Sequence, residues 1–128
     1  MNPRDLARAY AGGRLAIGVL LFLFPRRVIA GLAGGRDEVT PALVLVTRLV
    51  GIRDAILGAG TLAAITEGDA DRLRTWMTYG AIADGGDALA TLAGYRHLPR
   101  FKRFGLLAVA SGGAGTGAYL RQAGDHVS

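Results

Sequence analysis

The sequence predicts an all-α fold, an integral membrane bundle of four transmembrane helices that forms a single domain over residues 1–128. Hydrophobic residues make up 51% of the chain, and they gather in four stretches: 8–24, 41–66, 73–95 and 104–120. At about 1.5 Å per residue, each stretch covers most or all of a hydrocarbon core of about 30 Å. A soluble helical bundle would alternate charged and apolar residues along most of its length. Such alternation is missing here, since 55–66 and 105–120 contain no charged residue.

The first helix is expected to end at Pro25, because proline interrupts a helix, and Arg26 and Arg27 follow directly. Residues 15–24 also resemble the apolar core of a cleaved secretory signal. Signal peptidase requires small residues after such a core, and this chain has proline and two arginines there. We therefore expect the segment to be retained as a membrane span.

The later connections support the same partition. Thr40 is suited to cap the second helix, with Pro41 at its first position. The short acidic connection 67–71 predicts an antiparallel hairpin between the second and third helices. In the fourth helix, Gly113 and Gly117 form a GxxxG pair, which favours close packing within the bundle or in a homo-oligomer.

Composition limits the partners of the chain. The net charge of +5 does not come from a basic stripe with interleaved aromatic residues, so we expect no nucleic-acid partner. Attraction to the headgroups of a lipid bilayer explains the charge more simply, and the predicted location is the cell membrane, as a multi-pass protein. Basic residues are almost evenly divided between the two sides, so orientation stays open. The chain has no cysteine, which excludes disulfides and thiolate chemistry.

Five charged residues inside the apolar stretches mark the candidate site. A single charge at the centre of a spanning helix costs about 3 kcal/mol on insertion scales, so such residues normally face inward and pair. Counted along their helices, they reach similar depth near the bilayer centre. They are Arg48, Arg53, Asp54, Asp84 and Asp87.

Spacing predicts how these residues meet. Asp84 and Asp87 share one face of the third helix. On the second helix, small and polar residues form a stripe that should bring Asp54 within reach of a neighbouring helix. Arg48 and Arg53 lie at an angle to that stripe, so we expect them to reach sideways toward the first and fourth helices. The stripe consists of Gly51, Asp54, Gly58 and Thr61.

Charge counting adds a sixth candidate. The five residues hold two positive and three negative groups, and a buried carboxylate without a partner takes up a proton, a cation or a basic side chain. Arg14 of the first helix reaches the same depth and is the natural partner. If Arg14 instead extends to the interface, one aspartate is protonated or the site binds a positive ligand.

Two interpretations of the charges stay open. Paired Arg and Asp side chains can simply hold a small bundle together, or they can form a ligand or catalytic site, for which Asp54, Asp84 and Asp87 are the candidate acids. Two carboxylates around Gly85 and Gly86 could hold Mg²⁺. The motif is similar to the start of the lipid-alcohol phosphotransferase signature, but the downstream pair of spaced aspartates of that signature is missing, so no metal and no cofactor are expected.

The segment 48–58, RLVGIRDAILG, together with Asp84 and Asp87, resembles the small bacterial four-helix membrane proteins close to the DoxX-like group. The resemblance covers nearly the whole chain, although these two motifs are its distinctive part. It implies an integral membrane bundle with an intramembrane Arg/Asp site. It implies no reaction for this chain, because no reaction is assigned to the family.

Three functions are compatible with such a site. The preferred one is binding of a small hydrophobic or lipid-like ligand, with arginine holding an anionic or carbonyl group and aspartate a hydroxyl or amine. The second is an enzyme that uses an aspartate as general acid or base on a lipid-soluble substrate. The third is a small proton-coupled exporter that works as a dimer through the glycine-rich fourth helix.

Overall fold

The computed structural model describes residues 1–94, and they contain helices and no strand, as the predicted all-α class requires. The predicted helix 104–120, with its glycine pair and the oligomer contact assigned to it, lies outside the described residues. The elements in chain order are α1 (Pro3–Leu23), α2 (Pro25–Ala33), the 3-10 helix η1 (Arg36–Glu38), α3 (Pro41–Glu67) and α4 (Ala70–Gly94).

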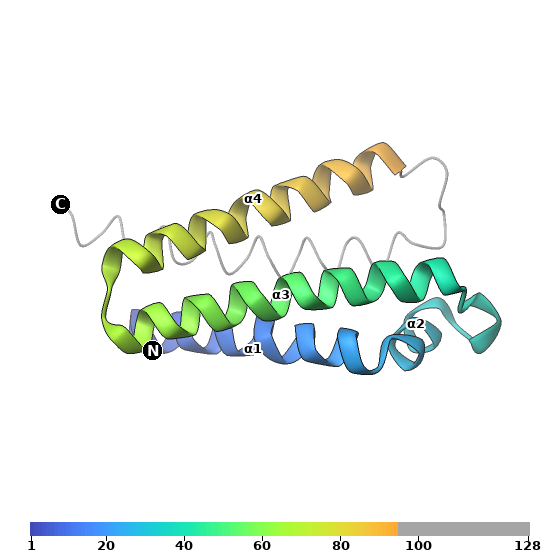
Figure 1. The fold of residues 1–128 in the computed structure, drawn as a ribbon, viewed down its shortest axis with the longest axis horizontal. Helices are drawn as coiled ribbons and strands as arrows, with labels where there is room; N and C mark the ends of the chain where they lie inside the picture. Colours follow the sequence, from blue (N-terminus) through green and yellow to red (C-terminus); the bar gives the residue numbers. More distant parts are fainter. Residues whose placement is uncertain (95–128) are drawn as a thin grey trace.

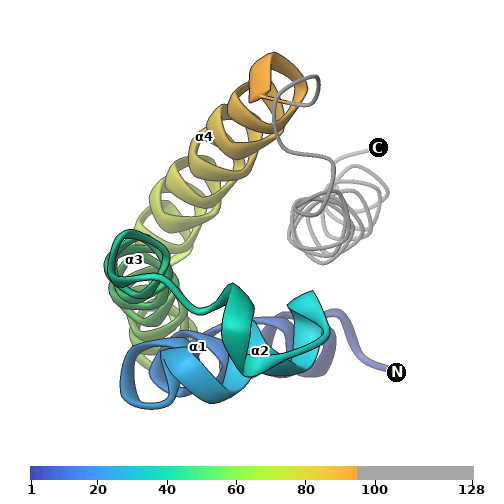
Figure 2. The ribbon, with the colours of Figure 1, turned by 90° about the vertical axis from the view of Figure 1, so that its right-hand side faces the viewer.

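Helices α1 and α3 form the centre of the described structure. They lie side by side and run in opposite directions, while α4 returns along α3 and diverges from it (Figures 1 and 2). The short helix α2 turns away from the axis of α1 at the end of the α1–α3 pair where α3 begins (Figure 1). As a result, α1, α3 and α4 run roughly along one direction, and residues halfway along each helix can meet.

Helix α1 begins five residues before the predicted start of 8–24 and ends one residue before its predicted end. The reason is a helix N-cap followed by proline, which the prediction from apolar stretches did not include. The side chain of Asn2 accepts a hydrogen bond from the backbone N–H of Arg4 at 3.0 Å. Pro3 occupies the first helical position, where its missing N–H costs nothing.

The first helix ends before Pro25, close to the predicted position, and Pro25 also starts a further helix, α2, that the sequence analysis did not include. Proline is well suited to the first helical position. Pro25 and Ile29, one turn apart, are buried, which ties the helix to the rest of the fold. The helix ends at Gly34, whose φ of 88° is a left-handed conformation that favours glycine.

Helices α3 and α4 form the predicted antiparallel hairpin (Figure 1). The predicted cap of α3 is confirmed, since Thr40 Oγ1 accepts from the N–H of Leu43 at 3.2 Å. Gly68, with φ 71°, ends α3, and the carboxylate of Asp69 accepts from the first backbone N–H groups of α4. Because Asp69 caps the helix this way, α4 starts at Ala70, three residues before the predicted 73.

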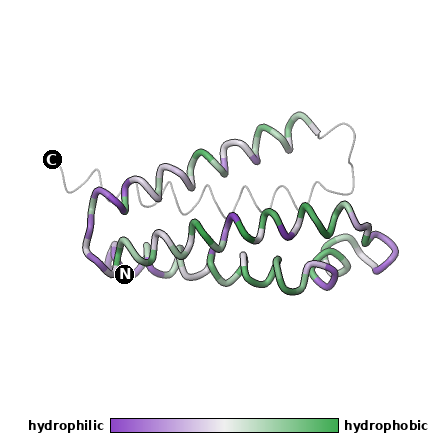
Figure 3. Tube along the Cα trace, in the orientation of Figure 1, coloured by the Kyte–Doolittle hydropathy of each residue, from purple (hydrophilic) through white to green (hydrophobic). Residues whose placement is uncertain are grey.

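Hydropathy differs among the three long helices. Hydrophilic residues gather in the connections and at the start of α4, the interiors of α1 and α3 are mostly hydrophobic with a few polar positions, and α4 mixes hydrophilic, neutral and hydrophobic residues along its length (Figure 3). Among residues 1–94, α1 is the one helix that meets a combined test of length and apolar composition for crossing a membrane. The four-span arrangement therefore stays a prediction, with α1 its best supported member.

Candidate functional site

Glycines on both sides of the α1–α3 contact bring the two backbones together. A Cβ atom on Gly58 would lie 2.6 Å from the backbone N of Leu15, and one on Gly18 would lie 2.3 Å from the backbone N of Ala55. A Cβ on Gly51 would lie 2.7 Å from the carbonyl oxygen of Gly18. The stripe predicted on 41–66 is therefore a packing face, and the helix that its glycines contact is α1. This close approach brings Asp54 beside the side chains of α1.

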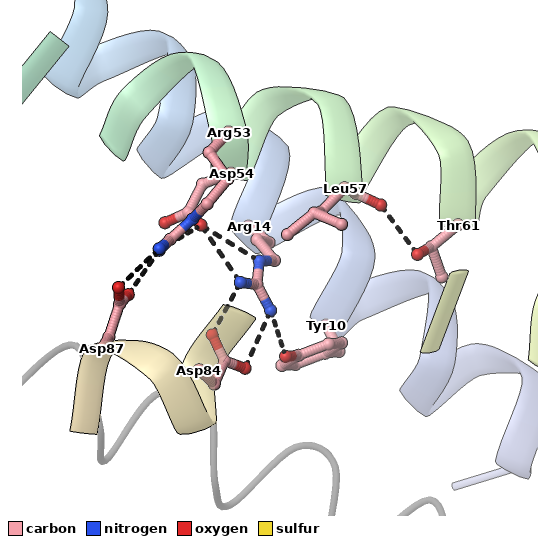
Figure 4. A network of polar contacts seen from close by, with 8 residues as sticks. All are labelled: Tyr10, Arg14, Arg53, Asp54, Leu57, Thr61, Asp84 and Asp87. Atoms are coloured by element: carbon pink, nitrogen blue, oxygen red, sulfur yellow. Dashed lines mark hydrogen bonds and ion pairs between the residues drawn. The ribbon is translucent and has the colours of Figure 1, made fainter. Parts of the chain in front are cut away.

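Arg14 of α1 lies at the centre of the site and joins three helices (Figure 4). Its two terminal nitrogens contact both oxygens of the Asp84 carboxylate of α4: Nη2 lies 2.7 Å from Oδ1 and Nη1 lies 3.0 Å from Oδ2. Its Nε and Nη2 also donate to Asp54 Oδ1 of α3, at 3.3 and 3.1 Å. The Arg14 side chain is 9% exposed. Such a bidentate, charge-assisted contact is the strong form of an ion pair.

A second bidentate pair lies toward the outside of the bundle. Arg53 of α3 donates from Nη1 to Asp87 Oδ1 at 2.6 Å, and its Nη2 lies 2.6 Å from Asp87 Oδ2. Nη2 also reaches Asp54 Oδ1 at 3.2 Å. The side chains of Arg53 and Asp87 are 30% and 32% exposed, so this pair is more exposed than the Arg14–Asp84 pair. Arg53 forms its ion pair with the hairpin partner α4 and not with the first helix, and the predicted fourth helix, 104–120, lies outside the described residues.

Asp54 links the two pairs. Its Oδ1 accepts hydrogen bonds from both Arg14 and Arg53, so a continuous Arg–Asp network crosses α1, α3 and α4 (Figure 4). Two arginines face three aspartates, which leaves one formal negative charge in the network. The network consists of Arg14, Arg53, Asp54, Asp84 and Asp87.

The network lies close to the middle of all three long helices. Arg14 is the twelfth of the 21 residues of α1, and Asp54 is the fourteenth of the 27 residues of α3. Asp84 is the fifteenth of the 25 residues of α4. Similar depth was predicted from counting along the chain, and the contacts of Arg14 confirm that these residues meet.

Arg48 is the one predicted site residue that lies apart. Its Nε donates to the backbone oxygen of Phe22 at 3.3 Å, and its guanidinium carbon lies 6.0 Å from the centre of the Phe22 ring. Six residues separate Arg48 from Asp54, which is about 9 Å along the helix and points the two side chains in different directions. Arg48 thus reaches sideways to α1, as expected, but belongs to no ion pair described within residues 1–94.

Tyr10 is a contact of the site that the sequence analysis missed. Its hydroxyl oxygen accepts a hydrogen bond from Arg14 Nη1 at 2.9 Å. The available signal was its position one turn before Arg14, since residues four apart share a helix face. Tyrosine is also typical of membrane interfaces, so the residue type alone did not indicate a site contact.

A small cavity lies beside Arg14, with room for about one water molecule. It opens between the three long helices, and Gly80 of α4 covers the Arg14 guanidinium there. The hydroxyl of Thr61 is already bonded to the Leu57 carbonyl oxygen at 2.7 Å. The lining residues are Tyr10, Ala11, Arg14, Leu57, Thr61, Trp76, Met77 and Gly80.

The three candidate acids differ in how many of their carboxylate oxygens contact an arginine. Asp84 and Asp87 each use both carboxylate oxygens on one guanidinium, whereas Asp54 uses Oδ1 alone.

Comparison of the chain with protein-family models, curated proteins and solved structures finds no match. Within residues 1–94, no group of three or more acidic or histidine side chains is arranged to hold a metal ion.

Proposed function

We propose that the chain is an integral membrane protein whose Arg–Asp network binds the polar head of a small hydrophobic ligand. One observation carries this proposal: five charged side chains lie halfway along three helices whose outer faces are apolar. Charge at that depth is costly in a bilayer and is normally kept for function. The resemblance to the DoxX-like group supports the same arrangement.

The apolar outer faces support the membrane part of the proposal. Large hydrophobic side chains are exposed along all three long helices, for example Ile17 at 49%, Leu49 at 57% and Leu89 at 70%. Only 22% of the most apolar window of α1 is buried, unlike the core helix of a soluble protein. Continuous apolar surface of this kind is unfavourable in water and favourable in lipid. It suits helices that face hydrocarbon chains.

Unequal exposure within the network supports the binding part. The side chains of Arg14 and Asp84 are 9% and 15% exposed and hold three helices together, so this ion pair has the structural role in the network. Arg53 and Asp87 are about twice as exposed or more, and they form the more exposed pair. Arg53 Nε is buried and has no hydrogen-bond partner within residues 1–94. A more exposed Arg–Asp pair next to a buried one suits contact between the network and the polar head of a ligand.

Membrane insertion is tested by extraction and labelling. The native chain has no cysteine, so single cysteines report one position each. Ile56→Cys and Ile82→Cys, near the middles of α3 and α4, should resist a membrane-impermeant maleimide in intact vesicles, whereas Asp71→Cys, in the first turn of α4, should react when its side is accessible. The protein should also stay in the membrane pellet after alkaline carbonate. Recovery in the soluble fraction, or labelling of Ile56→Cys and Ile82→Cys to the same extent as a reactive Asp71→Cys, would refute the membrane assignment.

Ligand binding is tested on purified wild-type protein in detergent. Octylamine, octan-1-ol and octanoate share one alkyl chain and differ in the head. A ligand that binds the folded state raises its melting temperature by mass action. At least one probe should therefore raise the melting temperature, in proportion to the logarithm of its concentration. A null result with all three heads would reject this binding function.

A further inference from the structure

We infer that the polar head of the ligand is a protonated amine and that Asp54 is the residue that binds it. This inference rests on the proposed function and adds the chemical class of the head. It comes from the charge balance of the network and from the one carboxylate oxygen in it that no arginine uses.

The charge balance can be resolved into pairs. Arg14 and Asp84 form one bidentate pair, and Arg53 and Asp87 form another. Each pair is formally neutral and uses both oxygens of its own carboxylate. Asp54 is the fifth member and forms ion pairs with both arginines, so the network as a whole has one negative charge in excess. An excess charge held in a poorly solvated place is stabilised best by a group of the opposite sign.

The geometry of Asp54 leaves room for that group. Three N–H donors converge on its Oδ1: Nε and Nη2 of Arg14, and Nη2 of Arg53. Its Oδ2 accepts no hydrogen bond from residues 1–94, and it points away from the Arg14 guanidinium (Figure 4). The side chain is 16% exposed, so it is neither sealed nor freely hydrated. A carboxylate oxygen in this position suits a charged N–H donor.

Within residues 1–94, the ion pairs of Asp54 are those with Arg14 and Arg53. Arg48 is bonded to Phe22 on a different side of α3. The sequence of the predicted helix between 105 and 120 contains no charged residue. A metal ion is a poor fit, because it would have to displace an arginine from Asp84 or Asp87 to gain more than one carboxylate. An organic cation needs only the one free oxygen.

The neighbourhood of the network also suits an alkyl tail. Leu49 and Ile56 lie about one turn on either side of Arg53 and are 57% and 55% exposed. A ligand whose ammonium group reaches Asp54 can therefore lay its chain on apolar surface as it leaves the site. A hydrophobic primary amine satisfies both requirements, with burial of each CH₂ group contributing about 0.8 kcal/mol.

The octyl series tests this inference on the wild-type protein. At neutral pH octylamine is protonated, as a lysine side chain is. Octylamine should raise the melting temperature more than octan-1-ol, and octanoate should have the least effect. An equal or larger shift with the alcohol or the carboxylate would overturn the amine assignment while leaving the proposed binding function intact. Absence of any shift would reject both.

A matched pair of variants assigns the site. Asp54→Asn keeps an oxygen that can accept from Arg14 and Arg53 but removes the charge, so it should weaken octylamine binding by about tenfold or more. Asp71→Asn removes a carboxylate from the exposed first turn of α4 and should bind octylamine like the wild type. Undiminished amine binding by Asp54→Asn would overturn the assignment. If that variant does not fold, the wild-type series still decides the class of the head.

Discussion

Arg14 and Asp84 form a bidentate ion pair although 70 positions separate them in the sequence, with N–O distances of 2.7 and 3.0 Å. The pair connects α1 to α4, which are not neighbours in the chain. It therefore holds the α3–α4 hairpin against the first helix, close to the midpoint of each element. The role of the Arg14 side chain in this contact leads to the first prediction.

Arg14→Leu should be strongly destabilising. Removal of one partner from a buried ion pair costs about 3–5 kcal/mol, because the other charge is left buried and unpaired, and here both Asp54 and Asp84 lose a donor. We expect the melting temperature in detergent to fall by about 10 °C or more. Arg48→Leu is the control, since Arg48 is exposed and outside the network, and it should shift the melting temperature little. Similar losses for the two variants would contradict the central role of Arg14.

The accessible pair, Arg53 and Asp87, should show strong coupling in a double-mutant cycle. Arg53→Met leaves Asp54 and Asp87 with fewer donors, and Asp87→Leu leaves Arg53 with Asp54 alone. Neighbouring charged residues typically show coupling energies of about 0.5–3 kcal/mol. The double variant should therefore be more stable than the sum of the two losses implies. Simple additivity of the unfolding free energies would show that the contact contributes nothing.

Gly58→Ala should separate α1 from α3. The new Cβ would lie 2.6 Å from a backbone nitrogen of α1, and a backbone atom cannot move aside as a flexible side chain can. Overpacking of this kind costs about 1–3 kcal/mol. Gly13→Ala is the matched control, because a Cβ at Gly13 meets nothing within 4 Å. Alanine also favours a helix over glycine, so the control should be as stable as the wild type or more so.

Trp76 provides a local optical reporter, since it is the only tryptophan in the chain. A Cβ on Gly60 would lie 2.3 Å from the Trp76 ring. Gly60→Ala should therefore displace the indole and shift its emission spectrum, with a smaller loss of stability than Gly58→Ala because a side chain can rotate away. An unchanged spectrum would show that Trp76 does not pack on Gly60.

The charged site was predictable because charge is rare in apolar segments, so Asp54, Asp84 and Asp87 were conspicuous in the sequence. The role of Arg14 followed from charge balance and depth, and the structure places it at the centre. Arg48 was included in the candidate site because of its depth, and its side chain contacts Phe22 of α1 instead of the network. Its angle to the stripe predicted a sideways contact, which is observed on the α1 side.

Other features depend on contacts that one sequence does not reveal. Tyr10 joins the site through its hydroxyl, and its type alone suggested a membrane interface. Helix α2 was missed because Pro25 was interpreted as a stop, although the same residue is well suited to begin a helix. The partner of the glycine stripe was also left undetermined by spacing. A stripe defines a close contact, and the topology decides which helix fills it.

The net charge of the Arg–Asp network changes sign as the chain is synthesised. Arg14, Arg53 and Asp54 lie on α1 and α3, which already pack closely through their glycines, and together these residues hold one net positive charge. Helix α4 then adds Asp84 and Asp87 and brings the total to one net negative charge. In the proposed membrane arrangement, a nascent chain that stops after α3 would attract an anion at mid-depth. The complete hairpin, with its net negative charge, repels one, so the proposed preference for a cationic ligand depends on α4.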